Sequence, residues 1–158
     1  MRASAALLRD VDEINMRQRA RTIDLAARLV ASTEEATIGV WGAAFKAGSD
    51  DVRDSPALDI AATLAARGAR VKVYDPAAGA NDRMVHPGLE YVDTAQEACA
   101  GVDLLLVLTE WEEFKGADPV SLAAAPTRAV VLDGRLVLDS DKWRAAGWEY
   151  HSLGRRTV

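Results

Sequence analysis

Hydrophobic residues along the chain follow two periods, and the change between them falls near residue 33. The apolar positions with helical spacing in the first part are Leu7, Val11, Ile14, Leu25 and Leu29. They stand among many alanines and arginines, so residues 4–31 are predicted to form one long amphipathic helix. Such a helix is too long for a small domain to cover. We therefore assign residues 1–33 to a connecting or dimerisation helix and residues 34–158 to an α/β domain.

After residue 33, short β-rich runs alternate with helical segments. The predicted strands are TIGVWG (37–42), RVKVYD (70–75), DLLLVLT (103–109), RAVVLDG (128–134) and WEYHSL (148–153). The predicted helices cover residues 56–67, 94–100, 118–124 and 140–146. Strands that alternate with helices are joined by right-handed crossovers, which produce a mostly parallel sheet covered on both faces. The pattern therefore predicts a Rossmann-like α/β fold of about five strands, preceded by the long helix.

Composition narrows the classes of function. The chain has 158 residues and a net charge of -5, which disfavours a nucleic-acid partner because such surfaces need clustered basic side chains. Three arginines of the long helix, Arg17, Arg19 and Arg21, point in different directions and are interpreted as a solvated face. No apolar run reaches the roughly 18 residues that suggest a membrane span. We therefore expect a cytoplasmic protein that binds neither nucleic acid nor membrane.

Cysteine and histidine are too few to support metal or disulfide chemistry. The single cysteine, Cys99, excludes an internal disulfide, and the two histidines are far apart in the sequence, which argues against a structural zinc site. Cys99 falls on a predicted short helix, far in sequence from any candidate base. We interpret it as a buried, inert thiol and not as a nucleophile.

The connection between the first strand and the next helix is the strongest chemical signal. The strand ends at Gly42 and the helix begins at Pro56, so 13 residues separate them. A dinucleotide-binding turn carries closely spaced glycines as G-x-G-x-x-G, whereas here the glycines are Gly39, Gly42 and Gly48. Long ordered loops in compact domains are often functional. The ordinary dinucleotide turn is therefore disfavoured, and anion binding by the inserted loop is favoured.

Lys46 and Arg53 are the candidate anion ligands in this loop. Lysine is a flexible point charge that suits a phosphate or a carbonyl oxygen, and arginine can hold a diphosphate with two parallel hydrogen bonds. The free amides at the start of the following helix also attract anions. The alternative is that both cations merely pair with Asp50, Asp51 and Asp54. The residues alone leave these two interpretations equally open.

Three further residues lie at the end of a predicted strand or just after one, and so approach the same crevice, because ligands of open parallel sheets bind beyond the carboxyl ends of the strands. Asp75 precedes a proline and is interpreted as a turn cap in preference to a ribose ligand. Arg135 is either a phosphate ligand or a surface arginine. Trp111 can pack on a ligand, although an aromatic residue more often belongs to a core or an interface.

Four segments of the chain are recognisable together: GVWGAAFKAGSDDVRDSPALDIAATLAARGARVKVYDP, DLLLVLTEWEEF, VVLDGRLVLD and WRAAGWEYHSLGR. With these segments, the chain resembles the C-terminal, nucleotide-sugar-binding domain of the UDP-glucose 6-dehydrogenase family. The segment LLRDVDEINMRQR resembles the end of the family's long central helix. Nearly the whole chain is covered, and the combination of A-F-K with D-D-x-R-x-S-P is specific. The resemblance implies oxidation of the C6 alcohol of UDP-glucose to a carboxylate, with two NAD and a covalent thiol intermediate.

The resemblance also implies roles for particular residues. Phe45 and Lys46 are implied to approach the UDP-sugar and Arg135 to contact the sugar nucleotide, whereas Arg53 is implied to reach an NAD bound mainly by the family's N-terminal domain. Cys99 matches neither the position nor the surroundings of the family's nucleophilic cysteine. We therefore assign no catalytic residue and expect the chain to be catalytically incomplete by itself. A homodimer formed through the N-terminal helix is also expected.

Two alternatives remain open at this stage. The first is a stand-alone, non-enzymatic module for nucleotide-sugar binding or dimerisation, because the apolar stripe of the long helix must be covered by something. The second is the same domain of a UDP-N-acetylmannosamine or GDP-mannose dehydrogenase. The residues that choose the base and the sugar are not all expected in this segment, so the sequence does not decide between these substrates.

Overall fold

The computed structural model describes residues 2–44, 46–48, 51–77 and 86–154. Within these residues the chain forms a six-stranded sheet of order β3-β2-β1-β4-β5-β6, and every neighbouring pair is parallel. The strands are β1 (Thr37–Trp41), β2 (Arg70–Tyr74), β3 (Glu90–Tyr91), β4 (Leu104–Val107), β5 (Val130–Asp133) and β6 (Glu149–Ser152). This order is that of the doubly wound dinucleotide-binding folds. The predicted Rossmann-like class is therefore confirmed.

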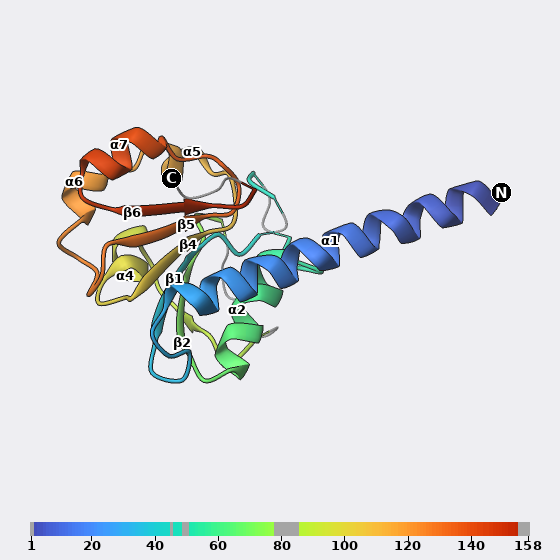
Figure 1. The fold of residues 1–158 in the computed structure, drawn as a ribbon, viewed down its shortest axis with the longest axis horizontal. Coiled ribbons are helices and arrows are strands. Elements are labelled where there is room, and N and C mark those ends of the chain that lie inside the picture. The colour runs from blue at the N-terminus through green and yellow to red at the C-terminus, as the bar shows by residue number, and fades with distance from the viewer. Residues whose placement is uncertain (1, 45, 49–50, 78–85, 155–158) are drawn as a thin grey trace.

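Helices cover both faces of the sheet (Figure 1). They are α1 (Arg2–Leu29), α2 (Pro56–Ala66), α4 (Ala95–Cys99), α5 (Glu112–Lys115), α6 (Pro119–Leu122) and α7 (Ser140–Ala145). The C-terminal half of α1 packs with α2 in one apolar cluster, and the four shorter helices pack in a second cluster on the opposite face. All four residues of β4 are buried, with alternate side chains in the two clusters. This double burial explains the unbroken apolar run of that strand.

Two short elements escaped prediction. The sheet has six strands instead of about five, because Glu90 and Tyr91 pair with β2 at its edge. The four-residue helix α5 was also missed. Neither the two-residue strand nor the single turn of α5 displays a hydrophobic period of its own, so their tertiary partners define them.

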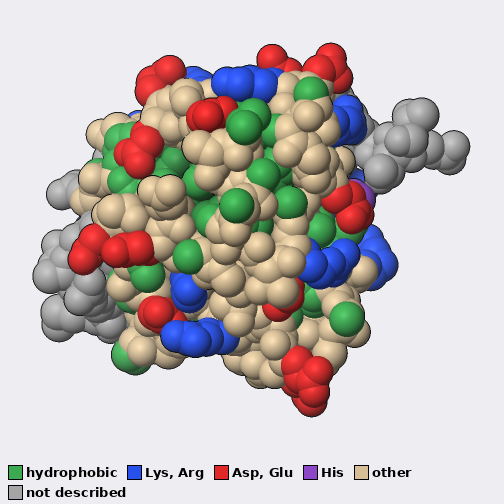
Figure 2. Space-filling model, turned by 90° about the vertical axis from the view of Figure 1, so that its left-hand side faces the viewer, with side chains coloured by type: hydrophobic (Ala, Val, Ile, Leu, Met, Phe, Trp, Pro, Cys, Tyr) green, Lys and Arg blue, Asp and Glu red, His purple; other side chains and the backbone are tan. Residues whose placement is uncertain are grey.

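The long helix α1 reaches well beyond the domain (Figure 1). Its large apolar side chains that are exposed in the described chain are Leu7, Leu8, Val11, Ile14 and Met16. Ile23 and Ala26, two turns further on, are buried against the domain. Among the helices of the described residues, none combines the length and apolar composition needed to cross a bilayer. On the face in Figure 2, acidic and basic side chains are interspersed.

Candidate functional site

A cleft of about 700 Å³ lies beyond the carboxyl ends of the strands, between α1 and the segments that follow β1, β4, β5 and β6. Its charged and amide side chains are Asn15, Gln18, Arg19, Lys46, Glu110 and Arg135. The volume falls within the range of small-molecule sites, and the position agrees with the crevice expected for an open parallel sheet.

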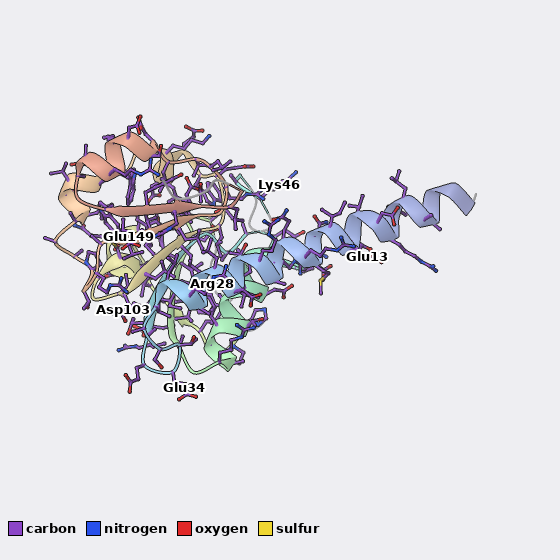
Figure 3. The ribbon with its side chains drawn as sticks, viewed as in Figure 1. Glu13, Arg28, Glu34, Lys46, Asp103 and Glu149 are labelled. Carbon is purple, nitrogen blue, oxygen red and sulfur yellow. The ribbon has the colours of Figure 1, made fainter. Side chains whose placement is uncertain are left out.

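Two of the candidate cations line this one cleft. Lys46 comes from the loop after β1 and Arg135 from the turn after β5, 89 positions apart in the sequence. Figure 3 shows Lys46 beside the point where α1 leaves the domain. Phe45, its predicted companion, lies outside the described residues. The fold therefore brings together the two described residues that were implied to contact a sugar nucleotide.

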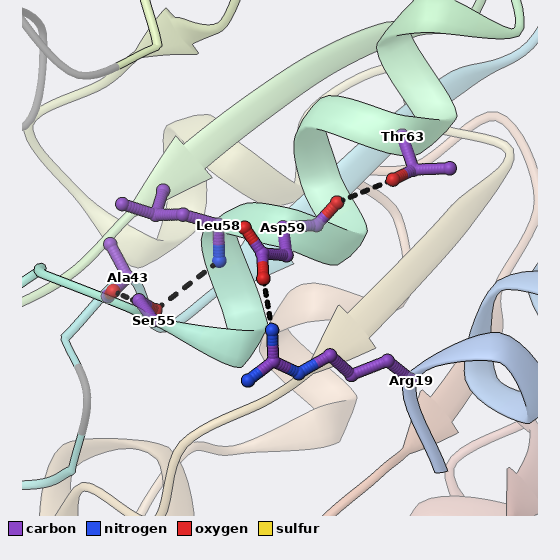
Figure 4. A network of polar contacts seen from close by, with 6 residues as sticks. All are labelled: Arg19, Ala43, Ser55, Leu58, Asp59 and Thr63. Atoms are coloured by element: carbon purple, nitrogen blue, oxygen red, sulfur yellow. Dashed lines mark hydrogen bonds and ion pairs between the residues drawn. The ribbon is translucent and has the colours of Figure 1, made fainter. Parts of the chain in front are cut away.

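The N-terminus of α2 opens into the same cleft through Pro56 and Ala57. The buried Ser55 hydroxyl accepts a hydrogen bond from the Leu58 amide at 3.3 Å and donates one to the Ala43 carbonyl at 2.6 Å (Figure 4). These two bonds cap the helix and fix the end of its preceding loop. Backbone amides at a helix N-terminus and the helix dipole favour a negative ligand. The cleft therefore combines two cationic side chains with an anion-binding helix end.

Arg135 stands on a turn that a buried carboxylate organises. Asp133 is fully buried and accepts hydrogen bonds from the Arg135 amide at 3.1 Å, the Leu138 amide at 2.8 Å and the Tyr150 hydroxyl at 2.9 Å. The Arg135 guanidinium lies 3.7 Å from the Glu110 carboxylate, and both side chains are partly exposed. The buried Asp133 carboxylate thus fixes the conformation of the turn, while the Arg135 side chain lines the cleft.

Asp75 is a hydrogen-bond acceptor that joins neighbouring loops. Its carboxylate accepts from the amides of Ala43 at 2.7 Å, Ala44 at 2.9 Å and Ala77 at 2.9 Å, and from Trp111 Nε1 at 3.1 Å. Three of these donors belong to loops other than its own. The predicted turn-capping role is therefore confirmed, and it extends to the loop that carries Lys46. Trp111, for which ligand packing was considered, binds this carboxylate and packs against the core.

Arg53 is not among the residues that line the cleft. Its guanidinium makes two parallel hydrogen bonds of 3.0 Å to Asp51 and is 85% exposed. These bonds raise the pKa of Arg53 and lower the pKa of Asp51. Of the two open interpretations of Arg53, the structure shows the pairing with a neighbouring aspartate, Asp51. Asp50, another predicted partner, lies outside the described residues.

The unusual glycine spacing has a packing explanation. A Cβ atom at Gly39 would lie 2.2 Å from the Ala98 carbonyl oxygen of α4. Gly42 has φ +110°, and a Cβ there would lie 2.0 Å from Thr109 Oγ1. Both glycines let neighbouring elements approach β1 and its end closely. Close packing therefore accounts for a glycine at each of these two positions.

Cys99 is the buried, inert thiol that the sequence predicted. It is fully buried in the cluster that contains Trp41 and Phe114, and this burial raises the pKa of its thiol to about 12. A thiol with so high a pKa carries almost no nucleophilic thiolate near neutral pH. Within the described part of the chain, no three histidine, cysteine or carboxylate side chains are grouped to hold a metal ion.

The interpretation of the α1 arginines as a solvated face was wrong for one of them. Arg17 is exposed and pairs with Glu13 at 3.0 Å, as a solvated residue does. Arg19 is only 23% exposed, forms an ion pair with Asp59 of α2 and lines the cleft. The available signal was its helical spacing with polar Asn15, Gln18 and Thr22, which places all four on one side of the helix.

A family model and several known proteins match this chain. The sequence model of the UDP-glucose/GDP-mannose dehydrogenase family, UDP binding domain, matches residues 39–140. The chain is 35% identical over 153 residues to UDP-glucose 6-dehydrogenase YwqF of Bacillus subtilis, covering 96% of this chain and 35% of that protein. It is 37% identical over 153 residues to TuaD, a second UDP-glucose 6-dehydrogenase of Bacillus subtilis, covering 96% of this chain and 33% of that one.

Solved structures lead to the same group of proteins. A UDP-glucose dehydrogenase from Pyrobaculum islandicum superposes with a TM-score of 0.71 at 33% identity, over 96% of this chain and 31% of that chain. An NDP-N-acetyl-D-galactosaminuronic acid dehydrogenase from Methanosarcina mazei superposes with a TM-score of 0.77 at 26% identity. The match covers 96% of this chain and 31% of that chain. The chain therefore spans about a third of the length of the curated relatives it matches.

Proposed function

Because this chain belongs to the UDP-glucose/GDP-mannose dehydrogenase family and matches its UDP-binding domain, we propose that the cleft beside α1 binds the UDP part of a nucleotide sugar. The observation that carries the proposal is the convergence of Lys46, Arg135 and the N-terminus of α2 on one cleft. A diphosphate carries negative charges that a lysine, an arginine fork and helix amides can bind together. Phe45 is proposed as a further contact.

UDP-glucose is the substrate we propose, on the basis of the two Bacillus subtilis relatives. The proposed overall reaction is the oxidation of UDP-glucose to UDP-glucuronate with two NAD. Because Cys99 is buried, the covalent thiol step requires a cysteine outside this chain, and the NAD is proposed to bind mainly outside it as well. Arg53 is proposed to reach that NAD after releasing Asp51. The predicted cytoplasmic location stays a prediction.

Titration of the chain with UDP and UDP-glucose by calorimetry tests the proposed site. Lys46→Ala and Arg135→Ala are each expected to weaken UDP binding by about tenfold, because each removes a charge-assisted contact to the diphosphate. Lys142→Ala removes an exposed lysine on α7, away from the cleft, and is expected to leave the affinity unchanged. Equal affinities for all four proteins would reject the site, and no measurable UDP binding by the wild type would reject the proposed function.

Self-association through α1 is a second proposal, favoured by the apolar side chains that α1 exposes beyond the domain, of which Leu7 is 65% exposed. Burial of such a stripe against a second copy removes apolar surface from water. Sedimentation equilibrium is expected to give twice the chain mass of 17.0 kDa. The double change Leu7→Glu and Ile14→Glu is expected to give a monomer. Val120→Glu, at an exposed apolar position of α6, is the matched control, and a monomeric wild type would contradict the proposal.

A further inference from the structure

The helix α1 presents a polar stripe to the cleft. Asn15, Gln18, Arg19 and Thr22 are spaced by three or four residues, lie on one side of the helix, and all line the cleft. The Thr22 hydroxyl donates to the Gln18 carbonyl at 2.9 Å, so this donor already has a partner within the helix. The two amides and the guanidinium have side-chain donors that can reach a ligand. One wall of the cleft is therefore formed by polar side chains of the long helix.

Arg19 is the cation of this stripe, and its hydrogen bonding is incomplete. Its Nη1 atom donates to the Asp59 carboxylate of α2 (Figure 4). Its Nε atom is buried and has no hydrogen-bond partner among the described residues. A buried donor without an acceptor is unfavourable and uncommon in folded proteins. The guanidinium is thus held at the cleft with a donor that a bound anion can satisfy.

We propose that Arg19 is a third cationic ligand of the anion that binds beside Lys46 and Arg135. Asp59 is its counter-ion while the cleft is empty, and a bound diphosphate replaces part of that pairing. This inference rests on the proposed function and adds α1 to the binding site. Asp59 is 47% exposed, so its carboxylate is solvated when the guanidinium turns to the ligand. The long helix is then a wall of the site as well as a connector.

A purely structural role predicts different behaviour. If the Arg19–Asp59 pair only fastened α1 to α2, removing either partner would loosen the cleft and weaken binding in the same direction. If Asp59 competes with the ligand for Arg19, removing the carboxylate has the opposite effect from removing the guanidinium. Variants of the two partners therefore separate the two roles.

Calorimetric titration of the full chain with UDP is the test. Arg19→Ala is expected to weaken UDP binding about tenfold, and Arg19→Lys, which keeps the charge but not the fork, is expected to weaken it by less. Asp59→Asn is expected to tighten binding by about threefold, because the competing charge is lost. Arg17→Ala, an exposed arginine on the same helix, is the matched control and is expected to bind as the wild type does.

Two outcomes would overturn the inference. The first is that Arg19→Ala binds UDP as tightly as Arg17→Ala, while Lys46→Ala and Arg135→Ala weaken binding; this leaves the proposed function intact. The second is that Asp59→Asn weakens binding as much as Arg19→Ala does, which assigns the pair a structural role. Absence of UDP binding by the wild type would overturn the proposed function together with this inference. Thermal unfolding of each variant checks that it is folded. If Arg19→Ala does not fold, the comparison of Arg19→Lys with Asp59→Asn tests the inference in its place.

Discussion

Replacement of Asp75 by alanine is expected to lower the free energy of unfolding by about 3 kcal/mol or more. The carboxylate accepts four hydrogen bonds from donors in the described part of the chain and is almost completely buried, so its removal leaves several donors without an acceptor. Each buried, unsatisfied donor costs about 1–3 kcal/mol. Domains of this size are stable by only about 5–15 kcal/mol, so the loss is a large fraction of the total. Urea denaturation followed by tryptophan fluorescence measures it.

Asp103→Ala is the matched control for this experiment. Asp103 is a partly buried aspartate whose carboxylate accepts a hydrogen bond from the Thr37 amide at 2.9 Å. Its removal is expected to cost about 1 kcal/mol. Asp75→Asn keeps one oxygen acceptor, so its loss of unfolding free energy is expected to lie between those of Asp75→Ala and Asp103→Ala. A loss for Asp75→Ala no larger than that for Asp103→Ala would show that the four-bond arrangement does not hold the loops together.

The second large effect is expected for Gly39→Ala, at about 3 kcal/mol of destabilisation. The added methyl group would lie 2.2 Å from the Ala98 carbonyl oxygen, which belongs to the backbone of α4. Backbone cannot rotate away as a flexible side chain can, so α4 must shift from the sheet. Trp41 Nε1 donates to the Ala95 carbonyl at 2.9 Å, and this bond between β1 and α4 would be strained by the shift.

Chemical denaturation of Gly88→Ala provides the comparison. A Cβ at Gly88 has no atom within 4 Å, and its backbone does not require a left-handed conformation. This change is expected to alter stability by less than about 0.5 kcal/mol. If Gly39→Ala were equally mild, α4 would not pack as closely on β1 as the structure shows.

The fold was predictable to the extent that its elements were long enough to show a period. The alternation of apolar strands with helical segments predicted five of the six strands and the Rossmann-like class, and the long helix was placed within two residues at each end. Glu90 and Tyr91 could not be predicted as a strand, because an edge pair of two residues depends wholly on the neighbouring strand for its hydrogen bonds.

The candidate site was predictable only in part. Lys46 and Arg135 were candidates because each follows a strand and parallel strands end at one edge, and the family resemblance then implied that both contact the sugar nucleotide. The role of Arg19 was missed because an arginine in an amphipathic helix is usually solvated, and only the packing of α1 on α2 turns this one toward the cleft. The pairing of Arg53 with Asp51 was one of two open interpretations, and local geometry decided it.

The sequence by itself determined five of the six strands, the long helix, where the capped helix α2 begins, and that the thiol is buried. These properties depend on neighbours a few residues away and on hydrophobicity, which the sequence contains directly. Only the tertiary structure decided which carboxylates have a structural role and which cationic side chains line the same cleft. Asp75 and Asp59 look alike in the sequence, yet one ties three loops together and the other holds Arg19 at the cleft. Such roles depend on partners 30 or more positions away, which only the folded chain brings within hydrogen-bonding distance.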